Sequence, residues 1–380
     1  MSAARPGPRT LVVRLDSAGD VLLAGPAVRA VAAGSSHTAL LCGPQGEAAG
    51  RLLPGPDEVL AYDAPWVSFD PPEVRREEVR ALVDAIAARR FDRALILTSY
   101  HQSPLPAALL LKLAGVPWIG ADCEDYPGSL LQLRHRRAAY RHEAAAALEL
   151  AEAAGFAPPE GDDGALRIDG HPATAHLTGE DPYVVLHPGA AVPARAWTPE
   201  RATRAAAALS DAGHRVVVTG SPGEESLTRR VAGRHALDLG GRTALPELAG
   251  VLAGARVVIA GNTGPAHLAA AVRTPIVSLF APVVSADRWL PYRVPHLRLG
   301  RQDSPCAGSR ARHCPVEGHP CLDSITDEEV IGAVEALTAG GPAGAAVAGT
   351  GTSGTTGTAG TRATTRATTR TGTPARKAAA

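Results

Sequence analysis

At 380 residues the chain has room for two domains of ordinary size, and its 45% hydrophobic and 20% charged residues are typical of soluble globular proteins. Its 38 Lys and Arg residues balance 38 Asp and Glu residues, so no overall field draws it to nucleic acid or anionic lipid. Five cysteines in a chain of this length exclude a disulfide scaffold.

Short apolar runs alternate with helical patterns in the first half of the chain. Strands are predicted over 11–15, 38–41 and 93–98, and helices over 21–33, 73–90, 106–114 and 137–154. This βαβ rhythm is typical of a parallel sheet with helices on both faces. The stretch after the last helix is rich in Gly, Pro and Asp, which predicts an irregular connection and the end of a first domain at residue 170.

The same alternation returns in the second half. Strands are predicted within 183–189, 214–220, 255–261 and 275–282, and helices over 199–212, 224–234, 245–253 and 265–272. We therefore expect an α/β protein in which two doubly wound, Rossmann-like domains, 1–170 and 171–339, face an interdomain cleft.

A Gly-, Thr-, Ala- and Arg-rich tail covers 340–380 and is predicted to be disordered, because it has too few large apolar side chains to form a core. Its basic residues allow weak contact with an anionic surface, although a solvated tail is the favoured interpretation. The sequence contains no export signal and no membrane-spanning run, so we expect a cytoplasmic protein, with peripheral contact at the inner membrane face left open.

A carboxylate lies at the first strand-to-helix turn. In "RLDSAGDVLL" the strand gives way to a helix at Ser17, Ala18 and Gly19, and Asp20 follows directly. In a parallel sheet this turn lies at the carboxyl edge, where ligands bind. Asp20 is equally explained as a first-turn acid that the helix dipole favours, and the loop alone does not decide between these interpretations.

Three loops of the second half have the residues of anion-binding turns. Gly189 and the small residues after it allow close backbone approach ahead of Arg195, and Gly220 ends another strand before two acids. Asn262, Thr263 and Gly264 open a small-residue helix whose free N–H groups suit a phosphate. Each loop alone is also explained by ordinary turn and cap chemistry. His187 and His267 alone are more typical of buried, hydrogen-bonded histidines.

Five successive stretches together resemble glycosyltransferase family 9, which includes the ADP-heptose:lipopolysaccharide heptosyltransferases. They are "RLDSAGDVLLAGPAVRAV", "LHPGAAVPARAWTPE", "VVTGSPGEESL", "DLGGRTALPELAGVLAGARVVIAGNTGPAHLAAAVRTPIVSLFAP" and "CPVEGHPCLDSIT". The resemblance runs from 11 to about 337 and is weakest over 42–182. It implies a GT-B type fold that binds acceptor on the first domain and sugar nucleotide on the second, without metal or other cofactor.

The resemblance also implies roles for individual residues. Asp20 matches the last acid of the family's R-x-S-S-x-G-D motif, its proposed general base. Arg195 matches the basic residue that neutralises the departing diphosphate, and Glu224 or its neighbour Glu225 matches an acid on the ribose. The remaining residues predicted to bind the donor are Thr263, Gly264, His267, Asn262, Gly189 and His187.

The sequence departs from the family pattern at two places. Asn262 stands where the family usually has Asp, so a role that needs a carboxylate there is in doubt, and Asp303 stands where a cysteine is frequent. Cys306, Cys314 and Cys321 lack the C-x-x-C or C-x-x-H pairs that structural zinc sites favour, and we expect no bound metal.

The leading hypothesis is an inverting glycosyltransferase. It moves a sugar, heptose by resemblance, from an ADP- or other nucleotide-sugar to a hydroxyl of a glycan or glycolipid acceptor, and has no nucleic-acid partner. One alternative is a nucleotide-sugar epimerase of similar fold, and another is a nucleotide-sugar-binding protein that has lost turnover. The donor sugar and base, the acceptor and the oligomeric state do not follow from the sequence.

Overall fold

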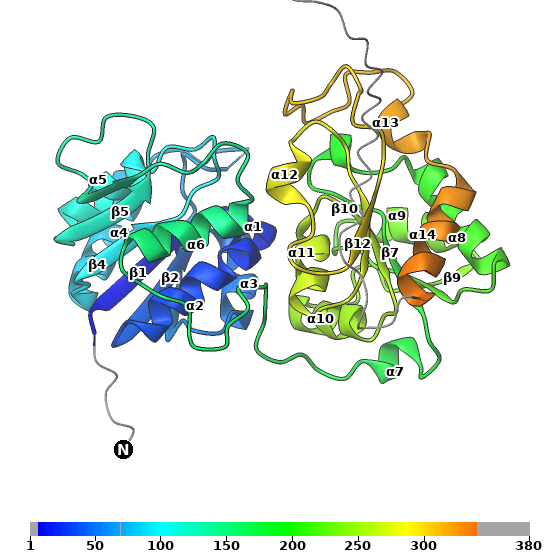
Figure 1. Cartoon of the computed structure of the whole chain (residues 1–380), viewed down its shortest axis with the longest axis horizontal. Helices are drawn as coiled ribbons and strands as arrows, with labels where there is room; N and C mark the ends of the chain where they lie inside the picture. The colour runs from blue at the N-terminus through cyan, green and yellow to red at the C-terminus, as the bar shows by residue number, and fades with distance from the viewer. Residues whose placement is uncertain (1–6, 69, 340–380) are drawn as a thin grey trace, which may run out of the picture. The chain divides into compact units, whose positions relative to one another are not determined.

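Two parallel sheets of six strands organise the residues that the computed structural model describes, 7–68 and 70–339 (Figure 1). The predicted α/β class with two doubly wound sheets is confirmed. The predictions made for 340–380, its disorder and its weak contact with anionic surfaces, lie outside the described residues.

The first sheet has the strand order β3-β2-β1-β4-β5-β6. Its strands are β1 (Arg9–Arg14), β2 (His37–Cys42), β3 (Glu58–Ala61), β4 (Arg93–Ile96), β5 (Trp118–Asp122) and β6 (Leu133–His135). Its helices are α1 (Ala18–Leu23), α2 (Gly25–Ala33), η1 (Pro44–Gly46), α3 (Glu47–Leu52), α4 (Arg76–Arg89), α5 (Leu105–Leu113) and α6 (Glu143–Ala153). The strand order reverses between β1 and β4, and such a switch point is where open α/β sheets bind ligands.

The second sheet repeats this topology with the order β12-β11-β10-β7-β8-β9. Its strands are β7 (Val184–His187), β8 (Val216–Val218), β9 (Ala236–Asp238), β10 (Val258–Gly261), β11 (Ile276–Leu279) and β12 (His296–Leu299). Its helices are α7 (Ala175–Thr178), η2 (Pro193–Arg195), α8 (Pro199–Asp211), α9 (Glu225–Ala232), α10 (Leu245–Ala253), α11 (Gly264–Ala271), α12 (Ala286–Trp289), α13 (Pro320–Asp323) and α14 (Asp327–Ala339). The switch point lies between β7 and β10. No helix in the described ranges is long and apolar enough to cross a membrane.

Alternate residues of each central strand enter different cores, because successive side chains point to opposite faces. In β1, Leu11 and Val13 join the core that includes α4 and α5, whereas Val12 joins the core that includes α1, α2 and α6. This second core continues into the other half of the chain, where it includes Leu252 of α10 and Leu268 of α11. The two halves therefore share one apolar core.

Two predicted helices differ from those observed. The helix expected over 21–33 is interrupted at Ala24, because Pro26 has no N–H to continue the hydrogen-bond ladder, and it starts α2 instead. The helix expected over 137–154 begins only at Glu143. Arg137 stays outside it because its guanidinium donates to the carbonyl oxygen of Thr98 at 2.7 Å and forms an ion pair with Asp122.

In the connection between the sheets, two adjacent acids form ion pairs with different halves of the chain: Asp162 with the first half and Asp163 with the second. Arg29 of α2 donates from Nε and Nη2 to the Asp162 carboxylate, at 2.6 and 2.9 Å. Asp163 forms an ion pair with Arg273, just after α11, and its carbonyl oxygen accepts from Nη1 of Arg293 at 2.5 Å. The domain boundary predicted at 170 lies between β6 and β7 and stays a prediction.

Candidate functional site

The switch point of the first sheet holds an arginine between two carboxylates. Arg14, the last residue of β1, is 2% exposed. Its Nη2 donates to Oδ1 of Asp20 at 3.0 Å, and its Nε lies 3.0 Å from Oδ2 of Asp16. Ser17, which precedes α1, donates from Oγ to Oδ2 of Asp20 at 2.8 Å. Asp20 therefore lies in the first turn of α1 with both carboxylate oxygens engaged.

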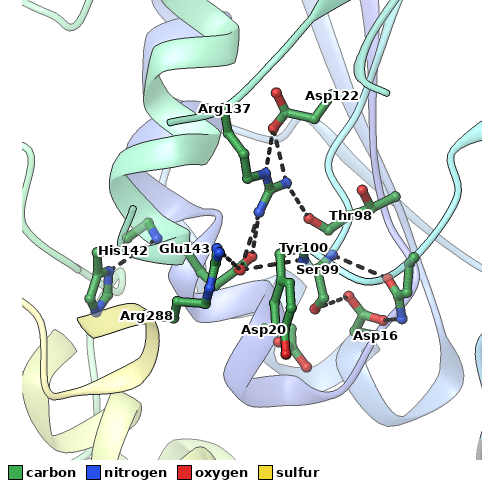
Figure 2. Close-up of polar contacts among 12 residues, drawn as sticks. Asp16, Asp20, Thr98, Ser99, Tyr100, Asp122, Arg137, His142, Glu143 and Arg288 are labelled. Atoms are coloured by element: carbon green, nitrogen blue, oxygen red, sulfur yellow. Dashed lines mark hydrogen bonds and ion pairs between the residues drawn. The ribbon is translucent and has the colours of Figure 1, made fainter. Parts of the chain in front are cut away.

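Asp16 is a site residue that the sequence analysis did not single out. Gln102 donates from Nε2 to its Oδ1 at 2.5 Å. Ser99 donates from Oγ to its Oδ2 at 3.4 Å (Figure 2). Burial raises the pKa of Asp16 to about 6; the Arg14 guanidinium opposes this shift and the Asp20 charge adds to it. The available signal was a second acid in the same turn, directly after a buried strand.

A chain of ion pairs runs from the end of β5 to α12. Arg137 binds Asp122 at the end of β5 and both carboxylate oxygens of Glu143, at 3.1 Å each (Figure 2). Arg288 of α12 lies 4.0 Å from Oε1 of Glu143, and its guanidinium carbon lies 4.1 Å from the ring centre of Tyr100. The segment after β4 is thereby held between α6 and α12.

The switch point of the second sheet carries unpaired buried polar atoms. Thr263 precedes α11 and makes no side-chain cap, which leaves the N–H of Gly264 without this partner. The free N–H groups expected at this helix start are fewer than predicted, because Pro265 has no N–H and the N–H of Ala266 donates to the carbonyl oxygen of Thr263 at 3.1 Å. Asn262 and His267 are 5% and 4% exposed, yet Nδ2 of the first and Nδ1 of the second have no hydrogen-bond partner. Burial lowers the pKa of His267 to about 4. These groups together are arranged to receive a polar ligand.

Arg195 lies at the same switch point because its loop packs against the end of β10. A methyl group at Gly261 would lie 2.6 Å from the carbonyl oxygen of Arg195, so only glycine permits this approach. The Arg195 Nε atom is buried without a hydrogen-bond partner. Burial lowers the pKa of Arg195, and the negative charge of Asp20 opposes that shift. Trp197 anchors the loop by donating from Nε1 to the carbonyl oxygen of Leu322 at 3.0 Å.

Glu224, Gly189 and His187 form a second group in this half. Glu224 accepts from N and Oγ of Ser221, at 2.8 and 2.7 Å, and its carboxylate fills the space where a side chain at Gly189 would lie. His187 is buried and its Nδ1 lies 3.0 Å from Oγ1 of Thr219. Burial lowers its pKa, which the Glu224 charge opposes. Glu225 packs against Gly241 instead.

The two switch points meet where α1 packs against α11. A methyl group at Gly19 would lie 3.1 Å from Cδ2 of His267 and 3.2 Å from Cα of Gly264. The charge of Asp20 also acts on His267 and on Arg195. Of the predicted site residues, the structure thus brings Asp20 of the first half together with Arg195, Gly264 and His267 of the second.

The three clustered cysteines are packed into the second half. Cys306 and Cys321 are buried in the core that lies against α8 and α14, and Sγ of Cys314 donates to the carbonyl oxygen of Val316 at 3.3 Å. Burial raises the pKa of Cys321 to about 11. Within 7–68 and 70–339, no group of three or more His, Cys, Asp or Glu side chains is placed to hold a metal ion. The expectation of no bound metal stays a prediction.

A family model described as glycosyltransferase family 9 (heptosyltransferase) matches residues 79–319, which is more than half of the chain. The chain belongs to glycosyltransferase family 9. Among curated members, it is 33% identical to lipopolysaccharide heptosyltransferase 3 of Escherichia coli over 42% of this chain and 47% of that protein. It is 28% identical to lipopolysaccharide heptosyltransferase 1 of Salmonella typhimurium over 54% of this chain and 66% of that protein. The chain thus spans less than two thirds of either relative's length.

Solved structures of family 9 proteins share this fold. A family 9 glycosyl transferase from Veillonella parvula superposes with a TM-score of 0.70 at 20% identity, covering 89% of this chain and 99% of that one. The Escherichia coli ADP-heptose lipopolysaccharide heptosyltransferase II gives a TM-score of 0.67 at 20% identity, with 87% and 98% covered. The architecture of two Rossmann-like halves is therefore of GT-B type, as the resemblance implied.

Proposed function

We propose that this family 9 protein transfers a sugar from a nucleotide-sugar, heptose from ADP-heptose, to a hydroxyl group of a glycan or glycolipid acceptor. The observation that carries the proposal is the packing of α1 on α11, in which Gly19, next to Asp20, lies against His267 and Gly264, so that the charge of Asp20 acts on His267 and Arg195 of the other half. Family membership supports it. So do the curated relatives, which are lipopolysaccharide heptosyltransferases, and a fold relative solved as the Escherichia coli heptosyltransferase WaaC with ADP, at a TM-score of 0.59.

In the proposed reaction Asp20 acts as general base. Its carboxylate accepts the proton of the acceptor hydroxyl while that oxygen forms a bond to the anomeric carbon. The bond from the anomeric carbon to the diphosphate oxygen breaks on the opposite face, and its electron pair leaves with the nucleoside diphosphate. Attack opposite to the leaving group inverts the anomeric configuration. Asp20 is 17% exposed at its side chain, which leaves it accessible to an acceptor.

The second half would bind the donor and stabilise the charge that builds on the departing diphosphate. The Arg195 guanidinium offers N–H donors to diphosphate oxygens, which suits its unpaired Nε. Nδ2 of Asn262 and the N–H of Gly264 are further donors in this region, since Pro265 has no N–H and the N–H of Ala266 already donates to the carbonyl oxygen of Thr263 at 3.1 Å. Glu224 rather than Glu225 is the acid we assign to the ribose, because it lies against Gly189.

The test is incubation of the purified chain with ADP-heptose, and with other nucleotide-sugars, in the presence and absence of glycan and glycolipid acceptors. We expect ADP release that depends on acceptor and a product whose anomeric configuration, read by NMR, is inverted. An epimerised nucleotide-sugar formed without ADP release would identify an epimerase instead. A donor that binds while no product forms with any acceptor would favour a binding protein.

A further inference from the structure

One guanidinium serves two carboxylates in the first half, and the proposed mechanism uses only one of them. Arg14 lies 3.0 Å from Oδ1 of Asp20 through Nη2 and 3.0 Å from Oδ2 of Asp16 through Nε. The Asp20 side chain is 17% exposed and the Asp16 side chain 7% exposed. The Asp20 side chain can therefore reach a substrate, whereas the Asp16 side chain is more deeply buried.

The remaining contacts of Asp16 fix its orientation. Gln102 donates to its Oδ1, and the Gln102 side-chain oxygen accepts from the backbone N–H of Ser99 at 3.2 Å. The Ser99 hydroxyl in turn accepts from Nη2 of Arg14 at 3.0 Å and donates to Oδ2 of Asp16. Asp16 thus joins the turn after β1 to the turn after β4, and Arg14 cannot shift without breaking these bonds.

The charge balance of this arrangement matters for a general base. A fully buried arginine paired with a single carboxylate stabilises the ionised form of that carboxylate and makes it a weaker proton acceptor. A second carboxylate on the same guanidinium offsets part of the positive charge. The paired carboxylate then keeps a higher affinity for protons while remaining fixed in place.

We propose that Asp16 is a positioning residue for the transfer reaction, which holds Arg14 and offsets its charge so that Asp20 is both oriented and sufficiently basic. The inference rests on the proposed function for its catalytic meaning. The groups whose charges act on Asp16 are Arg14 of β1, Asp20 of α1 and Glu143 of α6, with the uncharged Gln102 bound from the turn after β4.

A titration that needs no substrate tests this inference. Protein labelled with ¹³C at the aspartate carboxyl carbons is titrated by NMR, and the Asp20 signal is assigned by its loss in Asp20→Asn. In Asp16→Asn we expect the midpoint of the Asp20 titration to move to lower pH, because a neighbouring negative charge is removed from the shared guanidinium. Asp16→Ser removes the same charge and replaces Asp16→Asn if that variant does not fold.

Asp122→Asn is the matched control. Asp122 is also a buried carboxylate paired with an arginine at the end of a strand, but its partner is Arg137 rather than Arg14. Its replacement is expected to leave the midpoint of the Asp20 titration unmoved. If that midpoint is equally unmoved in Asp16→Asn, the inference is wrong whatever the activity of the variant.

Turnover of ADP-heptose separates this inference from the proposed function. In Asp16→Asn we expect kcat to fall at least tenfold at neutral pH, the acid limb of the pH–rate profile to move to lower pH, and ADP affinity to stay constant. Full turnover in Asp20→Asn would overturn the base assignment, while the titration would still decide the Asp16–Asp20 coupling. If Asp16→Asn is as inactive as Asp20→Asn with an unmoved titration, Asp16 is itself the base and the positioning role is refuted.

Discussion

Two separate effects explain why a carboxylate at position 20, in the first turn of α1, is favourable. A carboxylate near a helix N-terminus is favoured by the helix dipole, and the hydroxyl of Ser17 and the guanidinium of Arg14 both bind it. The same turn packs, through Gly19, against the start of α11. The first effect concerns folding and the second concerns a reaction, so a substitution that preserves shape separates them.

Asp20→Asn keeps the size of the side chain and much of its hydrogen bonding but removes the base. We expect turnover to fall by roughly 10²–10⁴-fold, the range for loss of a general base, with little change in ADP affinity or Tm. Transfer rates, calorimetry with ADP and thermal melts check this. If Tm falls strongly while each folded molecule still transfers sugar at the wild-type rate, Asp20 only stabilises the first turn of α1 and is not the base.

Asp16 makes the stability of the protein depend on pH in a direction that can be worked out. Its pKa is raised to about 6 in the folded protein, so the native state binds the proton more tightly than the unfolded chain does. This contribution to stability is fully present below about pH 4 and is lost as the pH rises through about 6.

Asp16→Asn imitates the protonated side chain at every pH. We expect the free energy of unfolding of this variant, minus that of the wild type, to rise by on the order of 2–3 kcal/mol from pH 4 to pH 7. Urea unfolding of both proteins at the two pH values measures this difference. An equal gap between the proteins at pH 4 and pH 7 would contradict the raised pKa.

The donor site makes a prediction in which two neighbouring acids behave differently. Arg195→Ala and Glu224→Ala should each weaken ADP binding by about 10- to 150-fold, because each removes a charge-assisted contact worth roughly 1.5–3 kcal/mol. Glu225→Ala is the matched control, since Glu225 packs against Gly241. Calorimetry with ADP gives the affinities. Unchanged affinity in both Arg195→Ala and Glu224→Ala would remove the donor-site assignment.

At the scale of the elements, the sequence predicted the strands in the middle of each sheet but missed β5, which is an inner strand, and the four edge strands. The apolar runs of β1, β7 and β10 stand out because central strands of a parallel sheet are buried on both faces. The edge strands β6 (Leu133–His135) and β9 (Ala236–Asp238) have three residues each and include polar ones, so they carry no periodic signal. Their pairing is decided by the neighbouring strand.

The same distinction applies to the candidate site. Turn chemistry indicated Asp20, Arg195 and Asn262, because each follows a recognisable strand. It gave no indication that Ser99 and Gln102 would bind Asp16, since these residues are brought together only when β4 pairs with β1. It also could not show which acid, Glu224 or Glu225, turns toward Gly189. Contacts between distant segments decide both.

The packing of α1 on α11 depends on glycine on one side more than on the other. A methyl group at Gly19 would press on the backbone of Gly264 at 3.2 Å and on His267 at 3.1 Å, whereas a methyl group at Gly264 would meet nothing closer than 3.7 Å. Gly19→Ala should therefore be less stable than Gly264→Ala, because the backbone of Gly264 would have to shift to admit the added methyl group. Gly264→Ala, the control, should be close to neutral. Chemical denaturation compares them, and equal effects would contradict the packing asymmetry.

At the scale of the molecule, the buried ion pair of Arg29 with Asp162 joins the connection between the sheets to the first half. Both side chains are under a tenth exposed, and Arg29 also donates to the carbonyl oxygen of Ala165 at 2.7 Å. Arg29→Ala should lower the free energy of unfolding by roughly 3–5 kcal/mol, because it leaves a buried carboxylate unpaired. Calorimetry measures the effect. The control is Arg51→Ala, which removes an exposed i,i+4 pair with Glu47 and should cost under about 0.5 kcal/mol. A similar loss of stability in both variants would contradict the stabilising role of the buried Arg29–Asp162 pair.

The two adjacent acids of the connection differ in how they respond to ionic strength. Asp162 and Arg29 are 5% and 7% exposed, whereas Asp163 and Arg273 are 47% and 43% exposed. Dissolved ions screen an exposed pair far more than a buried one. Rising salt is therefore expected to weaken the ion pair of the connection with the second half before its ion pair with the first.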